Sequence, residues 1–209
     1  MSTPSSFSIV SKETIAIGIA YLTRIDSDIN RVVTKLGSPP LWARDPGFGT
    51  LVHIILEQQV SLASARAVYE KLTEAAEVLT PSRFLDFSNL ELRGFGFSRQ
   101  KIDYCRGLAN MILEGNLDLD TLKDLSDQEI RSRLVEIKGI GPWTADIYLL
   151  MALRRSDIWP VGDLALVSAM QQVKGLSSLP DQESMNEIAS PWKPWRAVAA
   201  RILWHYYLN

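Results

Sequence analysis

The chain has 209 residues, of which 46% are hydrophobic, and a formal net charge of −2. This length suits one compact domain, or two small lobes that share a core. Because nucleic-acid-binding domains are usually basic, the bulk charge argues against such a function. It does not exclude one, since binding needs only a single positive face. Residues that could supply that face are Lys138, Arg154, Arg155, Lys193, Arg196 and Arg201.

Cysteine and histidine are scarce. The single cysteine, Cys105, excludes an intrachain disulfide and a four-cysteine iron–sulfur cluster, and its apolar neighbours predict a core position. Two histidines, His53 and His205, disfavour a zinc site. We find no apolar run long enough to span a membrane and no signal-peptide pattern. We therefore expect a soluble intracellular protein, cytoplasmic and nucleoid-associated in a bacterium or nuclear in a eukaryote.

Apolar residues recur mostly at helical spacing, and alternating β-branched runs are scarce. The sequence therefore predicts an all-α protein of about ten helices. Residues 1–9 are expected to form a flexible tail. The expected helices are, in chain order, 13–36 (one helix or a pair), 49–59, 61–79, a short helix from 80, 98–114, a helical hairpin at about 126–153, 163–173, and a last helix capped by Ser190 and opened by Pro191.

We expect one helical domain over 10–209, built as two lobes with a central cleft. One lobe combines 10–48 with 180–209. The central lobe covers about 49–179 and contains the hairpin. No internal repeat or low-complexity tract interrupts this organisation.

The most informative segment is the hairpin, where 135–145 reads VEIKGIGPWTA. Ser126 and Glu129 form the pattern of a capping box at the start of its first helix. The glycines Gly139 and Gly141 allow close backbone approach, and a proline follows at a favourable first position of the second helix. Bare N–H groups at such a helix start bind phosphate. The alternative is a simple loop between helices, which the glycines alone would favour.

This segment resembles the helix-hairpin-helix motif of the base-excision DNA glycosylase superfamily. GIGPWTA is especially similar to the DNA-3-methyladenine glycosylase II branch. Segments 55–61 (ILEQQVS), 96–101 (GFSRQK) and 192–204 resemble three further segments of that branch, in the expected order. The resemblance implies two helical lobes with a central cleft, without the N-terminal β domain of some members. It also implies a monomer that acts on damaged double-stranded DNA.

Asp163 lies where the family has its catalytic aspartate. In the family the cleft holds the lesion, and a carboxylate stabilises the positive charge that develops on the sugar when the base departs. It can also orient the attacking water. The structural alternative is that Asp163 caps the helix it begins, and the two roles are compatible.

Trp143 stands where relatives that also cut the DNA backbone carry a lysine nucleophile. The resemblance therefore implies a monofunctional glycosylase without lyase activity. Trp143, Ile147 and Trp204 are the expected base pocket, in which an indole face would stabilise a cationic alkylated purine such as 3-methyladenine or 7-methylguanine. Core packing of Trp143 and lobe packing of Trp204 are the alternatives. Some relatives carry tyrosine at the position of Ile147, so the pocket can differ.

The target base must be flipped out of the duplex. By resemblance, the loop that carries Ser98 and Arg99 contacts or fills the gap, although some relatives have leucine where Arg99 stands. Gln58 and Gln59 are expected to hydrogen-bond bases near it, with helix capping or packing as the alternative. The remaining expected DNA contacts are Gly139, Ile140, Gly141 and Thr144 of the hairpin.

No organic cofactor is implied. In the family, backbone carbonyls equivalent to those of Val135, Ile137 and Ile140 hold a monovalent cation, Na⁺ or K⁺. Two other functions compete with excision of alkylated purines. One is a glycosylase for a different lesion, such as ethenoadenine or a deaminated base. The other is a non-catalytic helix-hairpin-helix DNA-binding module.

Overall fold

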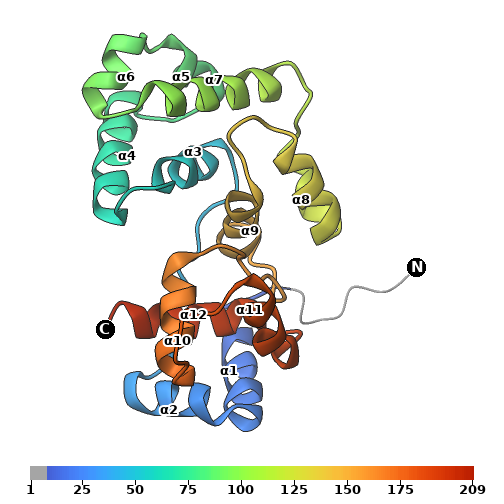
Figure 1. Cartoon of the computed structure of the whole chain (residues 1–209). Helices are drawn as coiled ribbons and strands as arrows, with labels where there is room; N and C mark the ends of the chain where they lie inside the picture. Colours follow the sequence, from blue (N-terminus) through green and yellow to red (C-terminus); the bar gives the residue numbers. More distant parts are fainter. Residues whose placement is uncertain (1–8) are drawn as a thin grey trace. The chain divides into compact units, whose positions relative to one another are not determined.

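The computed structural model describes residues 9–209, and within them the only β-structure is an isolated bridge between Ile9 and Arg155. All other regular elements of these residues are helices, so the predicted all-α class is confirmed (Figure 1). The expected tail over 1–9 lies outside the described residues, except for Ile9. None of the described helices is both long and apolar enough to cross a bilayer.

The chain divides into two compact units. One joins the residues up to 43 with 149–209, and the other is 44–148. The first unit contains α1 (Thr14–Ile25), α2 (Ser27–Leu36), α10 (Leu164–Lys174), α11 (Gln182–Ala189), the 3-10 helix η2 (Ser190–Trp192) and α12 (Arg196–Tyr207).

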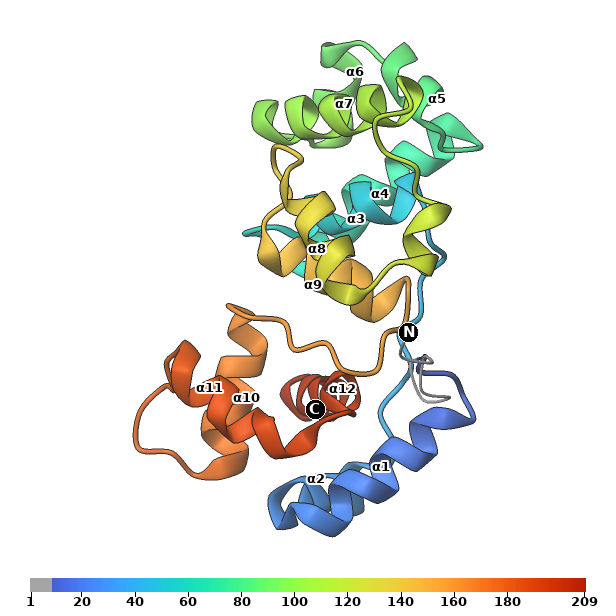
Figure 2. The ribbon, with the colours of Figure 1, turned by 90° about the vertical axis from the view of Figure 1, so that its right-hand side faces the viewer.

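The centre of the first unit is α12, in which residues 197–204 are all buried. It packs against α10, α2 and α1 (Figure 2). The unit boundaries differ from the predicted lobes, because 149–179 was expected to lie with the hairpin. These residues join the terminal segments instead, since α10 packs against α12 and α2. The central cleft stays a prediction.

The 13–36 segment takes one of its two predicted forms, a pair of helices, because the Asp26 carboxylate accepts the N–H groups of Asp28 and Ile29 and starts α2 there. The last α-helix begins at Arg196 rather than at Ser190 and Pro191. Pro194 lacks an N–H and disfavours a helical backbone in the residue before it, so 190–192 makes only a short 3-10 turn.

The second unit is built around α3. Its helices are α3 (Phe48–Glu57), α4 (Leu62–Ala76), α5 (Pro81–Asp86), α6 (Asn89–Phe95), α7 (Arg99–Leu113), the 3-10 helix η1 (Thr121–Asp124), α8 (Asp127–Val135) and most of α9 (Pro142–Met151). α3 packs against α4 and α7, and α5 packs against α7 (Figure 1). The Phe84 ring joins these elements, with centroids 5.8 Å from Phe48 and 5.9 Å from Phe97. Gln58 at the end of α3 and Tyr104 on α7 contact the turn of the hairpin formed by α8 and α9.

Candidate functional site

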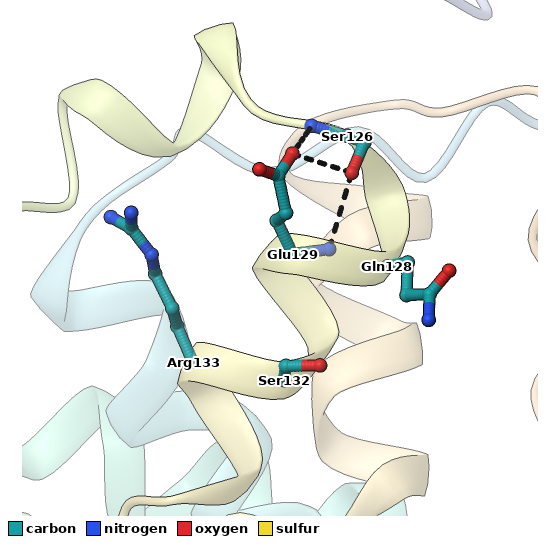
Figure 3. A pocket seen from close by; sticks show the side chains of 5 residues that line it. All are labelled: Ser126, Gln128, Glu129, Ser132 and Arg133. Carbon is teal, nitrogen blue, oxygen red and sulfur yellow. Dashed lines mark hydrogen bonds between the residues drawn. The ribbon is translucent and has the colours of Figure 1, made fainter.

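The predicted capping box at the start of α8 is confirmed. The Glu129 carboxylate accepts the Ser126 N–H at 2.9 Å, and the Ser126 hydroxyl oxygen accepts the Glu129 N–H at 3.3 Å (Figure 3). The capping-box residues line a pocket together with Gln128, Ser132 and Arg133. Since the Glu129 carboxylate in this pocket already accepts hydrogen bonds from the helix cap, we assign the pocket no ligand.

A salt bridge joins the two helices of the hairpin. The Arg131 Nε on α8 donates to Asp146 Oδ1 on α9 at 2.7 Å, and the Asp146 side chain is buried. Ile140, in the turn between them, is buried as well. The two helices of the hairpin are therefore held together by this salt bridge and by the buried Ile140 side chain. The sequence did not reveal this pair, because its partners are 15 residues apart on different helices.

The two hairpin glycines serve different purposes. Gly139 has φ +94°, and a Cβ there would overlap the Tyr104 ring. At Gly141 nothing lies within 4 Å of the Cβ position. The first bond of α9 runs from Ala145 N to Gly141 O, so the Gly141 and Thr144 N–H groups have no acceptor inside the helix. Gly139 thus shapes the turn, while Gly141 keeps open space beside the helix start.

Gln58 supports the hairpin from α3. Its side-chain nitrogen donates to Gly139 O at 2.8 Å and to the Thr144 hydroxyl oxygen at 2.9 Å. Lys101 Nζ in turn donates to Leu56 O at 2.7 Å and to Gln58 O at 2.9 Å. Desolvation lowers the pKa of Lys101. This geometry favours the packing alternative for Gln58, and the buried Thr144 hydroxyl faces the Gln58 side chain.

Replacing Gln58 by leucine is expected to lower the free energy of unfolding by about 1–3 kcal/mol, because Gly139 O and the Thr144 hydroxyl lose their donor. Urea unfolding measures this loss. Gln59→Leu at the exposed neighbouring position is the control and should leave stability within about 0.5 kcal/mol of wild type. Equal free energies of unfolding for Gln58→Leu and Gln59→Leu would contradict the conclusion that Gln58 stabilises the hairpin.

Three other expected DNA contacts in this unit are exposed, namely Gln59, Ser98 and Arg99. Gln59 is exposed at the turn between α3 and α4, with φ +56°. Arg99 is exposed at the start of α7, whose N-cap is Ser98. Phe97 beside them is buried in the core and therefore offers no side chain to DNA.

The predicted catalytic residue lies in the first unit. Asp163 caps α10, and its Oδ1 accepts the Leu166 N–H at 2.9 Å. The same oxygen accepts Trp204 Nε1–H at 3.2 Å. Asp163 is 9% exposed and Trp204 is 7% exposed. The Asp163 side chain therefore caps α10 and also pairs with the Trp204 indole. Its predicted roles as a helix cap and as a catalytic carboxylate are compatible with this geometry.

Trp204 lies in a part of α12 that is buried on all sides. Every residue from 197 to 204 is buried, and so is Trp195 just before the helix. A simple two-faced helix therefore does not describe this segment.

A second tryptophan, which sequence reasoning missed, contacts this pair. Trp42 lies in the irregular segment after α2, and its ring centroid is 6.4 Å from that of Trp204, with the planes at 72°. Its backbone has φ +46°. A tryptophan outside any periodic segment carries no sequence signal of such a contact.

The remaining predicted site residues are on the hairpin. Trp143 is half-buried and Ile147 is buried, and a spacing of four residues puts them on one face of α9. The carbonyl of Val135 lies at the end of α8 and that of Ile137 just after it, where the negative end of the helix dipole suits a cation. Ile137 O also accepts the Ile140 N–H at 2.9 Å.

Two of the basic residues suggested for a positive face have other partners. Arg201 is fully buried and donates to the carbonyls of Leu41, Ala197 and Leu150. Burial lowers its pKa to about 10. Arg196 pairs with Asp157, with Nε 2.6 Å from Oδ1. Neither is therefore assigned to DNA.

Comparison with known proteins identifies the family. The model of the HhH-GPD superfamily base excision DNA repair proteins matches residues 52–194. The chain belongs to this superfamily. Its helix-hairpin-helix is thus a family feature, as the sequence resemblance implied. The chain is 28% identical over 165 residues to a putative DNA-3-methyladenine glycosylase of Bacillus subtilis, with 75% of this chain and 58% of that protein covered.

Two further relatives cover more of the chain. DNA-3-methyladenine glycosylase 2 of Escherichia coli is 28% identical over 85% of this chain and 65% of its own length. The solved structure of Schizosaccharomyces pombe 3-methyladenine DNA glycosylase in complex with abasic DNA matches with a TM-score of 0.85 and 26% identity. That match covers 90% of this chain and 95% of the other. The fold is therefore that of helix-hairpin-helix glycosylases.

Proposed function

We propose that the protein is a monofunctional DNA glycosylase that hydrolyses the N-glycosidic bond of alkylated purines, chiefly 3-methyladenine and 7-methylguanine. The observation that carries the proposal is the buried Asp163 carboxylate, fixed by the Trp204 indole at 3.2 Å. Superfamily membership and relatives named 3-methyladenine glycosylases support the choice of substrate.

In the proposed reaction, the bond between the sugar C1′ and the base nitrogen breaks, and its electron pair leaves with the base. A nucleotide whose purine is methylated at N3 of adenine or N7 of guanine carries a positive charge on the base, so the base departs without prior protonation. The sugar acquires oxocarbenium character, which the Asp163 carboxylate stabilises. Water then bonds to C1′ and loses a proton, with Asp163 orienting it. The products are the free base and an abasic site.

The proposed DNA contacts divide by type. Backbone N–H groups at the start of α9 bind phosphate, with Gly139 and Ile140 shaping the turn. The exposed side chains proposed to contact DNA around the flipped-out base are those of Gln59, Ser98 and Arg99. The residues proposed to contact the flipped-out base are Trp143 and Ile147 of the second unit and Trp204 of the first. The protein is proposed to act as a monomer on damaged duplex DNA.

The carbonyls of Val135, Ile137 and Ile140 are proposed to hold Na⁺ or K⁺. Such an ion would place positive charge beside a bound phosphate. No organic cofactor is proposed. The protein is also proposed to be cytoplasmic and nucleoid-associated in a bacterium, or nuclear in a eukaryote.

Borohydride trapping is expected to give no covalent protein–DNA adduct, because Trp143 occupies the position of the lyase nucleophile and water attacks instead. The assay uses methylated duplex DNA, with a bifunctional glycosylase/lyase on its own lesion as the positive control. The product strand should stay intact until alkali is added. A trapped adduct, or strand cleavage without alkali, would show that an amine of this chain attacks the sugar.

A lesion panel separates this function from its two competitors. The panel contains duplexes carrying 7-methylguanine, 3-methyladenine, ethenoadenine and hypoxanthine. Release confined to the last two bases would favour a glycosylase for another lesion. Salt-dependent DNA binding without release of any base would favour a binding module.

A further inference from the structure

Trp42 differs from most tryptophans of the chain in its burial. Four of the six are buried, namely Trp159, Trp192, Trp195 and Trp204. Trp42 is only half-buried, yet its ring contacts buried Trp204, the partner of the Asp163 carboxylate. It therefore presents indole surface to solvent next to the proposed catalytic group.

The two indoles are nearly perpendicular, at 72° with centroids 6.4 Å apart. This edge-to-face geometry is favourable for an aromatic pair. It also creates a corner, because a planar ring stacked on one indole would present its edge to the other. The carboxylate bonded to Trp204 adds negative charge to this corner. A flat cation is the ligand that such a combination favours.

The backbone holds Trp42 in a conformation that costs energy. Its φ of +46° is in the left-handed region, which bulky side chains rarely occupy. The carbonyl of the preceding residue, Leu41, is held at 2.8 Å by Nε of the fully buried Arg201. Arg201 also donates to Ala197 O and Leu150 O, so it cannot move without breaking three hydrogen bonds. Strained conformations that the surroundings fix in this way cluster at ligand sites.

We propose that Trp42 is a further base-binding residue, whose indole forms a second aromatic wall beside Trp204 and favours cationic N-alkylated purines over neutral bases. Arg201 acts as a positioning residue that presents Trp42 through the Leu41 carbonyl. The inference rests on the proposed glycosylase function, because it concerns the base that the Asp163 site would release.

The test compares Trp42→Leu with Trp42→Phe. Leucine keeps apolar bulk without a π face, while phenylalanine keeps the face. We expect Trp42→Leu to lower single-turnover release of 7-methylguanine by about tenfold, with Trp42→Phe close to wild type. Affinity for an abasic duplex should stay within about twofold in both variants, because that DNA has no base to stack.

Tyr207→Leu supplies a matched control, since this tyrosine lies on α12 with 51% exposure and no role in the proposed site. It should behave as wild type. Thermal unfolding of each variant reports any damage to the fold.

Three results would overturn the inference. In the first, Trp42→Leu releases 7-methylguanine as fast as wild type. In the second, it weakens abasic-duplex binding as much as it slows release, which is the pattern of a purely structural role. In the third, leucine and phenylalanine slow release equally. If wild type itself releases no methylated purine, the proposed function fails first and the inference fails with it. The wild-type arm therefore distinguishes the two failures.

Discussion

Replacing Asp163 by asparagine is expected to lower base release by at least about 100-fold while leaving the protein folded. The neutral amide cannot offset the positive charge that develops on the sugar. Asparagine is as good an N-cap as aspartate. Its carbonyl oxygen can still accept the Leu166 and Trp204 hydrogens that the Asp163 Oδ1 accepts. The loss should therefore appear in the chemical step rather than in stability.

Single-turnover release from methylated duplex DNA, together with thermal unfolding, measures both quantities. Asp181→Asn is the matched control, because Asp181 caps α11 by accepting the Ser184 N–H at 2.9 Å. Asp181→Asn makes the same chemical change at a helix cap that lies outside the proposed site. The control should release bases at the wild-type rate. If Asp163→Asn did the same, Asp163 would be a helix cap alone.

The second large effect concerns the two hairpin glycines. Gly139→Ala is expected to destabilise the protein by about 2–5 kcal/mol, because the backbone has φ +94° and the new Cβ would overlap Tyr104. Gly141→Ala meets open space and should change stability by less than about 1 kcal/mol. Its methyl group would nevertheless stand where the proposed phosphate approaches.

Gly141→Ala is therefore expected to weaken binding of an abasic duplex by about tenfold, the equivalent of one charge-assisted hydrogen bond. Urea unfolding and fluorescence anisotropy with labelled duplex measure the two effects. Equal stability loss in both variants would contradict the assignment of Gly139 to the turn. Unchanged DNA affinity in Gly141→Ala would contradict phosphate binding at the start of α9.

Local sequence patterns predicted the parts of the fold that depend on neighbours in the chain. The Ser126–Glu129 capping box is one example, since both partners lie within one turn. Asp163 as the cap of α10 is another. The predicted start of the last helix was wrong. Pro194 prevents the helix that the Ser190 and Pro191 pattern would open, so the helix begins only at Arg196.

Contacts between distant segments were not predictable in the same way. Gln58 lies 81 residues from Gly139, and the sequence alone left open whether its amide would meet a base or support the hairpin. Trp42 approaches Trp204 through a strained irregular segment, which has no periodicity. Trp204 was identified by family resemblance, but its hydrogen bond to Asp163 spans 41 residues and required the fold.

Release of free base from methylated duplex DNA by the wild-type protein, resolved by chromatography, tests the proposed function most directly. We expect 3-methyladenine and 7-methylguanine to appear as free bases, each leaving an abasic site in an uncut strand. DNA binding without release of a methylated purine would contradict it.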